Sequence, residues 1–358
     1  AAGLGASPSA SLSASSSGTY FGRALAGGAD VNHDGYDDIV IGAPRTSSRA
    51  GAVYVHHGSA SGVATSPART LTPPSGQFYF GARVTLGDFD RDGHADLAVN
   101  APYHGMLYVY EGSAAGVGAG ITTAMSAELG LMSSTAAQPA VGDWNGDGTD
   151  DLVWVDGLEV RVHHGSAAGL SSSATATLSV SYAFGSDEVL AAAGDADGDG
   201  YDDLLVFDGE EIDWHRGGAA GLSDDASATL ADPGTAPTGE SDTRFGYARA
   251  AGDVDGDGFS DVVIGASQAD AAYVFAGARA GLSTTSSLTL GGEGLSTFGE
   301  VVTGAGDVNG DGFADVAVGD PEAEAVYVFH GSAAGVGTTA ATTLGDGAAS
   351  GTFGAAVA

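Results

Sequence analysis

A nine-residue acidic pattern, Asp-x-(Asp/Asn)-x-Asp-Gly-x-x-Asp, occurs six times along this chain. The copies occupy residues 30–38, 88–96, 143–151, 195–203, 253–261 and 307–315, and successive copies begin 52 to 58 residues apart. A repeat of about 50 residues is long enough for one unit of four short β-strands. The spacing therefore predicts a repeat architecture in which every unit carries one acidic loop.

The chemistry of the loop predicts a site for a hard cation. Side-chain oxygens stand at positions 1, 3, 5 and 9, a backbone carbonyl at position 7 completes the set, and glycine at position 6 permits a sharp turn. We expect about six Ca²⁺ ions, one in each loop. The predicted ligands are Asp30, Asn32, Asp34, Tyr36, Asp38; Asp88, Asp90, Asp92, His94, Asp96; Asp143, Asn145, Asp147, Thr149, Asp151; Asp195, Asp197, Asp199, Tyr201, Asp203; Asp253, Asp255, Asp257, Phe259, Asp261; and Asp307, Asn309, Asp311, Phe313, Asp315.

Other calcium-binding patterns fit the sequence less well. An EF-hand needs a bidentate glutamate at position 12 and flanking helices, but position 12 is apolar in all six copies. A nonapeptide β-roll would recur every nine residues. Asp-Gly turns that bind nothing would explain single copies, but not four oxygens at fixed places in six. Because every unit repeats the same loop, we expect structural rather than catalytic calcium.

The charge balance agrees with bound cations. The chain has 46 acidic and 11 basic residues and a formal net charge of −35, which argues against nucleic acid or an anionic membrane as a partner. Of the acids, 21 are aspartates at the loop positions. Two like charges about 4 Å apart repel by about 4 kcal/mol at an effective dielectric near 20. The chain has no cysteine, so calcium is expected to take the stabilising role that disulfides have in many secreted proteins.

The segments around each loop predict an all-β fold. In the first unit the loop lies between Phe21-Gly22 and the apolar run 39–44, followed by the β-rich run 51–58 and the stretch 68–71. Four runs of strand length separated by glycine and proline make one antiparallel sheet. Apolar runs follow the other loops at 97–102, 152–157, 204–209, 262–266 and 316–321. Such strands are buried on both faces, and radial stacking of the sheets as blades of a β-propeller buries them without helices.

The chain ends bear on the number of blades. We expect a single domain over residues 1–358, with partial flanking strands at 1–18 and 353–358, because both ends resemble parts of the repeat. Pairing of these flanks in one blade would remove open sheet edges. Seven blades, the last incomplete in this chain, are therefore favoured, and six blades are the alternative.

No catalytic arrangement stands out, so we expect no enzymatic activity. The sequence lacks a Gly-x-Ser-x-Gly elbow, a His-Glu-x-x-His motif and a phosphate-binding loop. Histidines recur where the second β-rich run ends, as in His56-His57 and His163-His164. We interpret them as exposed strand-end residues, because neighbouring residues of a strand point to opposite faces and cannot chelate one ion together.

The ordered motifs resemble the FG-GAP repeat. They are a Phe-Gly pair, the acidic loop with its apolar run (306–319) and the run Ala-Val-Tyr-Val-Phe-His-Gly (325–331), and they recur over essentially the whole chain. The third unit departs from the pattern, because residues 137–140 contain no Phe-Gly. FG-GAP repeats build the N-terminal propeller of integrin α subunits and many bacterial surface proteins.

This resemblance implies a calcium-stabilised adhesion or protein-interaction module that is extracellular, secreted or on the cell surface. Its partner would be a protein ligand, a cell-surface or matrix component, or a glycan, with no nucleic acid and no direct insertion into a membrane. A carbohydrate-binding propeller, or the accessory domain of a polysaccharide-degrading enzyme, is the alternative. Exposed tryptophans would favour that alternative, and the chain has three: Trp144, Trp154 and Trp214.

Overall fold

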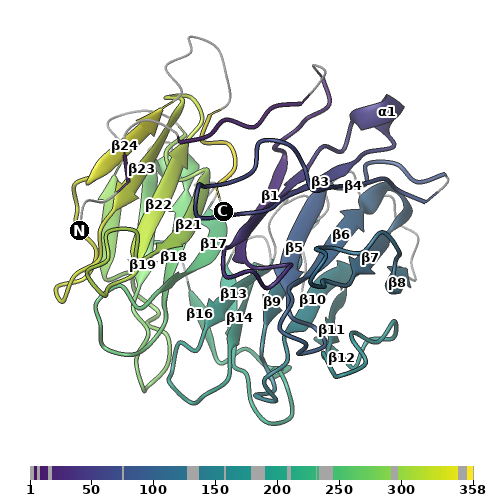
Figure 1. The fold of residues 1–358 in the computed structure, drawn as a ribbon. Coiled ribbons are helices and arrows are strands. Elements are labelled where there is room, and N and C mark those ends of the chain that lie inside the picture. The colour runs from purple at the N-terminus through teal and green to yellow at the C-terminus, as the bar shows by residue number, and fades with distance from the viewer. Residues whose placement is uncertain are drawn as a thin grey trace.

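The computed structural model describes residues 4–5, 9–14, 18–74, 76–126, 137–156, 159–178, 190–207, 211–230, 232–233, 245–291, 297–345 and 353–357. These residues form six four-stranded antiparallel sheets, here called blades one to six (Figure 1). In every blade the strands are hydrogen-bonded in chain order. The predicted all-β fold of four-stranded blades is therefore confirmed.

Blade one contains β1 (Ala24–Ala29), β2 (Asp38–Gly42), β3 (Val53–His56) and β4 (Arg69–Leu71). Blade two contains β5 (Arg83–Gly87), β6 (Asp96–Ala101), β7 (Met106–Tyr110) and β8 (Thr123–Ser126). Blade three contains β9 (Ala140–Gly142), β10 (Asp151–Asp156), β11 (Glu159–His163) and β12 (Ala176–Leu178).

Blade four contains β13 (Leu190–Gly194), β14 (Asp203–Phe207), β15 (Ile212–His215) and β16 (Ala228–Leu230). Blade five contains β17 (Phe245–Gly252), β18 (Asp261–Ala266), β19 (Ala271–Phe275) and β20 (Leu288–Gly291). Blade six contains β21 (Val301–Gly306), β22 (Asp315–Asp320), β23 (Ala325–Phe329) and β24 (Thr342–Gly345). Short turns labelled α1 (Thr46–Arg49), η1 (Pro102–His104) and η2 (Ser267–Ala269) join the second and third strands of blades one, two and five.

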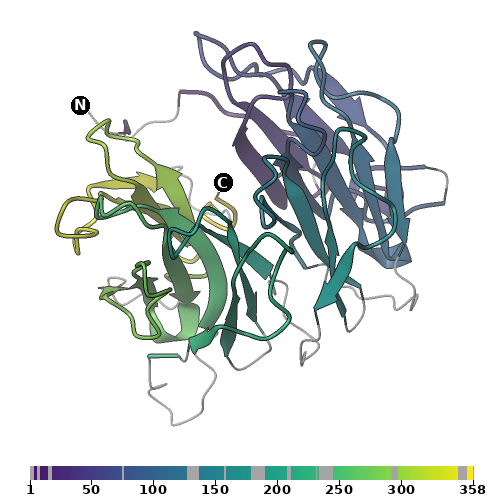
Figure 2. The same ribbon diagram turned by 90° about the horizontal axis from the view of Figure 1, so that it is seen from below.

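The blades are arranged around a central axis (Figure 2). The first strands β1, β5, β9, β13, β17 and β21 contact one another in that order and lie innermost. The apolar core lies mostly between neighbouring blades. Val40 of blade one and Leu97 of blade two, for example, belong to one buried cluster. The second strand of each blade is buried on both faces, as predicted. Each of these strands begins at the last aspartate of its acidic loop.

Aromatic pairs explain the Phe-Gly motif. The phenylalanine packs against a tyrosine on the third strand of its own blade, as in Phe80 with Tyr108, whose ring centroids lie 6.1 Å apart. Phe21, Phe245 and Phe298 form the same pair in blades one, five and six. A Cβ added to Gly81 would lie 2.8 Å from the Ala52 carbonyl of the preceding blade, at a positive φ of 81°. Glycine follows phenylalanine because the backbones of adjacent blades nearly touch there.

The described residues form six complete blades, which matches the alternative rather than the favoured seven. Within the described parts of the two predicted flanking strands, residues 4–5, 9–14, 18 and 353–357 adopt no strand conformation; residues 1–3, 6–8, 15–17 and 358 lie outside the described residues. A strand requires a hydrogen-bonded neighbour, and in the described part of the chain neither flank belongs to any of the six sheets. Instead, Phe353 and Val357 pack against the cluster of blade six that contains Val326.

Candidate metal centre

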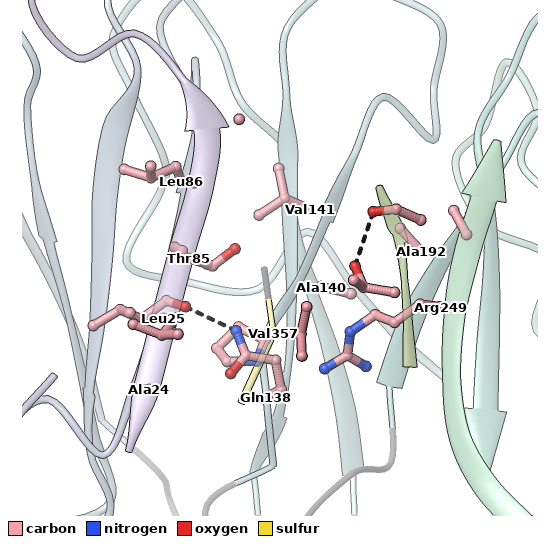
Figure 3. A pocket seen from close by; sticks show the side chains of 18 of the residues that line it. Ala24, Leu25, Thr85, Leu86, Gln138, Ala140, Val141, Ala192, Arg249 and Val357 are labelled. Carbon is pink, nitrogen blue, oxygen red and sulfur yellow. Dashed lines mark hydrogen bonds between the residues drawn. The ribbon is translucent and has the colours of Figure 1, made fainter. Parts of the chain in front are cut away.

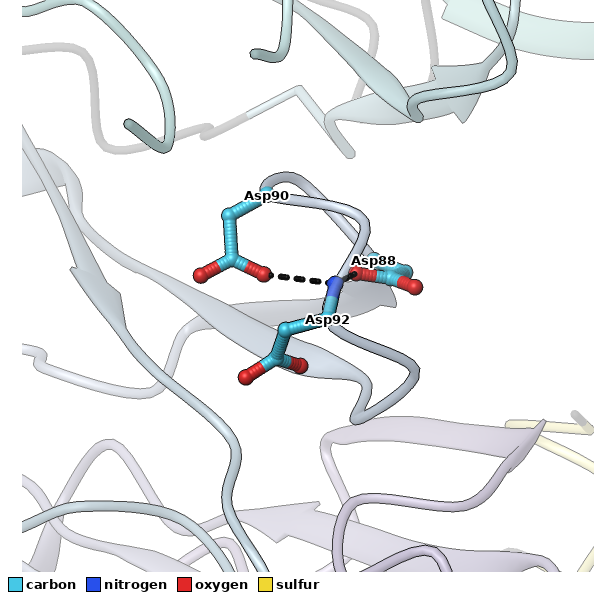
Figure 4. Close-up of side chains that lie close together, drawn as sticks. All are labelled: Asp88, Asp90 and Asp92. Atoms are coloured by element: carbon cyan, nitrogen blue, oxygen red, sulfur yellow. Dashed lines mark hydrogen bonds between the residues drawn. The ribbon is translucent and has the colours of Figure 1, made fainter. Parts of the chain in front are cut away.

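Each acidic loop connects the first and second strands of its blade, and the first aspartate organises the turn. Its carboxylate accepts the backbone N–H of the position-6 glycine at 2.7 to 3.0 Å in all six loops. In the second loop, the Asp92 N–H donates to both Asp88 and Asp90, each at 3.1 Å (Figure 4). The carboxylates at positions 1, 3 and 5 are thereby gathered around one turn.

The last aspartate of each loop joins the loop to the third strand. One of its oxygens accepts an N–H from a glycine just beyond that strand at 2.8 to 2.9 Å. The glycines are Gly58, Gly112, Gly165, Gly217, Gly277 and Gly331. In five of the six loops the other oxygen accepts the N–H of loop position 2, as from Val31 to Asp38 at 2.9 Å. Position 9 therefore has a structural role in addition to its predicted role as a ligand.

Burial perturbs these aspartates. It raises the pKa of Asp96, Asp151 and Asp203 to about 7 and that of Asp261 to about 6, against the opposing effect of the glycine N–H donors. By contrast, the backbone N–H groups around the exposed Asp307, led by that of Gly312, lower its pKa. A buried carboxylate with a raised pKa is one whose negative charge lacks a sufficient counter-charge. In these four loops, a positive charge beside the buried carboxylate would stabilise its charged form.

The geometry fits a calcium ion. Carboxylate oxygens of Asp88, Asp90 and Asp92 lie within 4.8 Å of one another, and so do two comparable sets, Asp195, Asp197, Asp199 and Asp253, Asp255, Asp261. The first, third and sixth loops carry asparagine at position 3, which supplies an amide oxygen in place of a carboxylate. A donor set made only of oxygen atoms suits Ca²⁺. The position-7 carbonyls of Tyr36, His94, Thr149, Tyr201, Phe259 and Phe313 remain predicted ligands.

Neighbouring loops are linked by a regular set of backbone hydrogen bonds. The N–H at position 8 of one loop donates to the position-1 carbonyl of the preceding loop, as from Ala95 to Asp30 at 3.0 Å and from Ser260 to Asp195 at 3.0 Å. The same bond joins each consecutive pair from blade one to blade six. Because these bonds join consecutive loops, the six predicted metal sites lie in one connected row, here called the rim, from blade one to blade six.

Residues at loop positions 4 and 7 also form contacts between neighbouring loops, a role that was not predicted from the sequence. A Cβ added to Gly146 would lie 2.5 Å from the ring of Tyr201 in the next loop, and Gly198 faces Phe259 in the same way. In the second loop, Arg91 instead donates to the Asp147 carbonyl at 2.8 Å. The signal in the sequence is the glycine at position 4 in the third to sixth loops, where nothing in the ligand pattern requires it.

The histidine interpretation needs a correction. His56 and His163 are at most 3% exposed, contrary to the expectation of exposed strand-end residues, and His215 is buried in the same way. Their Nδ1 atoms lie 2.8 to 2.9 Å from the carbonyls of Ala64, Ser171 and Ser223, in the connections that lead to the fourth strands. These imidazoles are buried because they brace that connection from inside the blade.

A cavity of about 920 Å³ occupies the centre of the propeller and is lined by the first strands and by residues 355–357 (Figure 3). Several of its polar groups are engaged by the protein itself. Gln138, in the unit without Phe-Gly, donates from Nε2 to the Val84 carbonyl at 2.8 Å, and Arg249 donates to the Ala248 carbonyl at 2.8 Å. Asp150 and Asp202 accept the N–H groups of Asp88 and Asp143. These contacts give the polar lining a structural role.

Comparison with known families agrees with the geometry. A model described as the FG-GAP repeat matches residues 21–56, and one described as an FG-GAP-like repeat matches residues 88–154, 143–206 and 253–318, more than half of the chain. The chain belongs to the FG-GAP repeat family. The integrin-like β-propeller expected from the motifs is thus confirmed.

Curated relatives of this FG-GAP protein include integrin alpha subunits. Integrin alpha-PS5 of Drosophila melanogaster is 39% identical over 102 residues, which are 26% of this chain and 10% of that protein. Integrin alpha-3 of Cricetulus griseus is 37% identical over 107 residues, 28% of this chain and 10% of the relative. Human integrin alpha-7 is 36% identical over 143 residues, 37% of this chain and 12% of the relative. The chain thus matches about a tenth of the length of these relatives.

Proposed function

We propose that this FG-GAP propeller is a calcium-stabilised, non-enzymatic adhesion or protein-interaction module that acts outside the cell. The observation that carries the proposal is the row of six acidic loops, in which every predicted ligand is an oxygen atom and three loops bring three carboxylates within 4.8 Å of one another. The integrin alpha relatives support a role in adhesion. Calcium at extracellular, millimolar concentration would fill even weak sites of this kind. Among the described residues, no helix is long and apolar enough to cross a membrane.

The face opposite the acidic loops offers a surface for a protein partner. In an antiparallel blade, the connection between strands two and three emerges at the end away from the loop between strands one and two. At that end of blade two, Phe78 is 40% exposed and Tyr103 is 41% exposed, and their ring centroids lie 5.5 Å apart. Phe78 also stacks on His104. Exposed aromatic clusters of this kind are typical of binding surfaces.

The tryptophans argue against the carbohydrate-binding alternative. Trp144, Trp154 and Trp214 are at most 4% exposed, so none of them offers the exposed aromatic face on which a sugar ring could stack. The exposed aromatic cluster of blade two instead consists of Phe78 and Tyr103 beside His104, an arrangement that we expect to suit a protein surface.

Binding to a panel of purified extracellular matrix proteins, measured in parallel with a glycan array, tests this proposal. We expect a protein ligand whose binding is lost when calcium is chelated. The double change Phe78→Ala and Tyr103→Ala should weaken binding by about tenfold or more, because buried aromatic anchors contribute about 2 kcal/mol each to interfaces. Ile121→Ala is the matched control, since Ile121 is an exposed residue in the connection between β7 and β8, at the other end of the same blade. A ligand found only on the glycan array would contradict the proposal.

A further inference from the structure

One position next to the acidic loops varies in charge from blade to blade. It is the residue directly before the glycine that donates to the last aspartate of each loop. In blades one to six it is His57, Glu111, His164, Arg216, Ala276 and His330. Its side chain reaches loop position 3 in two different ways: the His57 ring lies 3.3 Å from the Asn32 amide, and the Arg216 guanidinium forms an ion pair with Asp197.

The Arg216 guanidinium lies among the carboxylates of the fourth loop. Its Nη2 contacts Asp197, whose side chain is fully buried, and lies 3.5 Å from Oδ2 of Asp199. Those two residues are positions 3 and 5, and with Asp195 they form the oxygen cluster that fits a metal ion. The guanidinium carbon also lies 5.7 Å from the ring centre of Trp214, a cation–π distance. Arg216 is thus held over the fourth loop by contacts on two sides.

A positive charge at this place has two effects on calcium binding. It neutralises part of the repulsion between the loop carboxylates, so that the empty loop is stabilised. It also repels an incoming divalent ion and competes for the oxygens of Asp197 and Asp199, because a guanidinium binds carboxylates directly. The fifth loop provides the contrast: it has the same four aspartates, but Ala276 stands at the position of Arg216.

We propose that Arg216 is a built-in counter-ion of the fourth loop, which therefore keeps its shape without calcium and binds calcium more weakly than the fifth loop. The inference rests on the proposed calcium binding of the other loops. It divides the six chemically similar loops into sites that depend on external calcium and one that partly supplies its own cation.

Calcium titration by calorimetry, with native mass spectrometry to count bound ions, tests the inference on three variants of the whole chain. Arg216→Gln should tighten calcium binding at one site by about two- to fivefold, which is the size of effect expected from a partly exposed ion pair. The reciprocal change Ala276→Arg should weaken one site by a similar factor. Arg69→Gln is the charge-matched control, because Arg69 lies on the outer strand β4 of blade one, and it should change neither the number of sites nor their affinities.

Amide hydrogen exchange locates the effect. In calcium-free wild-type protein, amides of residues 195–203 should exchange more slowly than those of 253–261, and Arg216→Gln should remove that difference. Unchanged affinities in both Arg216→Gln and Ala276→Arg, with calcium still bound, would overturn this inference and leave the proposed function intact. A wild-type chain that binds no calcium at any loop would overturn both.

Discussion

At the scale of single residues, the aspartates at position 9 of the acidic loops combine burial with a carboxylate group. Asp203 accepts two backbone N–H groups, from Gly217 at 2.9 Å and Ala196 at 3.2 Å, yet burial still raises its pKa to about 7. Two hydrogen bonds do not replace the solvation that a buried carboxylate loses. A divalent ion beside it would supply the missing stabilisation.

This environment predicts an unusual pH dependence in protein stripped of divalent ions. The folded pKa values of Asp96, Asp151, Asp203 and Asp261 lie at about 6 to 7, above the ordinary value of 3.8. The folded state therefore binds more protons than the unfolded state, and the contribution of these groups to the free energy of unfolding falls as pH rises from about 4 to about 7. Urea unfolding of metal-free protein at several pH values measures it. Added calcium should abolish the decline, and metal-free protein that gains stability across this range would contradict the assignment.

The sequence pattern predicted which side-chain oxygens lie close together, but it did not predict the contacts that other residues make around the loops. The spacing within 195–203 indicates four side-chain oxygens on one turn, and the structure brings three of them within 4.8 Å. The ion pair from Arg216 to Asp197 could not be predicted, because it joins a loop to a strand end 19 positions away and depends on the register between β14 and β15. The buried histidines were missed for the same reason, since burial at a strand end depends on the connection that covers it.

At the scale of elements, the junction between the third strand and the acidic loop is a point of close backbone approach in each blade. A Cβ added to Gly277 would lie 2.3 Å from the Ser260 carbonyl and 2.8 Å from the Ala196 carbonyl. These are backbone atoms of two different blades, so neither can move without disturbing a loop. The glycine is required by close approach rather than by its backbone angles.

The change Gly277→Ala should therefore lower the free energy of unfolding by about 1–3 kcal/mol through overpacking. Gly120→Ala is the control, because no heavy atom lies within 4 Å of the Cβ it would add. Thermal denaturation of both variants in saturating calcium is the measurement. Equal melting temperatures for the two would show that the junction can relax more easily than its geometry indicates.

At the scale of the whole molecule, the six loops concentrate negative charge on one face. Of 46 acidic residues, 21 are loop aspartates, and the position-8 hydrogen bonds join the loops into a continuous rim. We expect removal of calcium with EGTA to lower the melting temperature by about 10 °C or more, because each site filled at ten times its Kd contributes about 1.4 kcal/mol. Molar sodium chloride should restore part of the loss by screening the carboxylates. A melting curve unchanged by EGTA would contradict structural calcium.

The architecture could be predicted from the sequence because both the acidic loop and the apolar strand that follows it recur in every unit. It favoured the wrong number of blades, because similarity of the two flanks to a repeat does not supply the hydrogen-bonded neighbour that a strand needs. The central cavity was also beyond prediction, because the bond from Gln138 to the Val84 carbonyl crosses from one blade to another.

The bonds between loops have a consequence for how such a molecule can change over time. They join backbone groups, as from Ala314 to Asp253, so their formation does not depend on which side chains the two units carry. A unit can therefore be duplicated, exchanged or allowed to diverge while still docking onto either neighbour. This tolerance is consistent with a third unit that joins its neighbours although residues 137–140 contain no Phe-Gly, and it makes individual units suitable for transplantation between proteins of this kind.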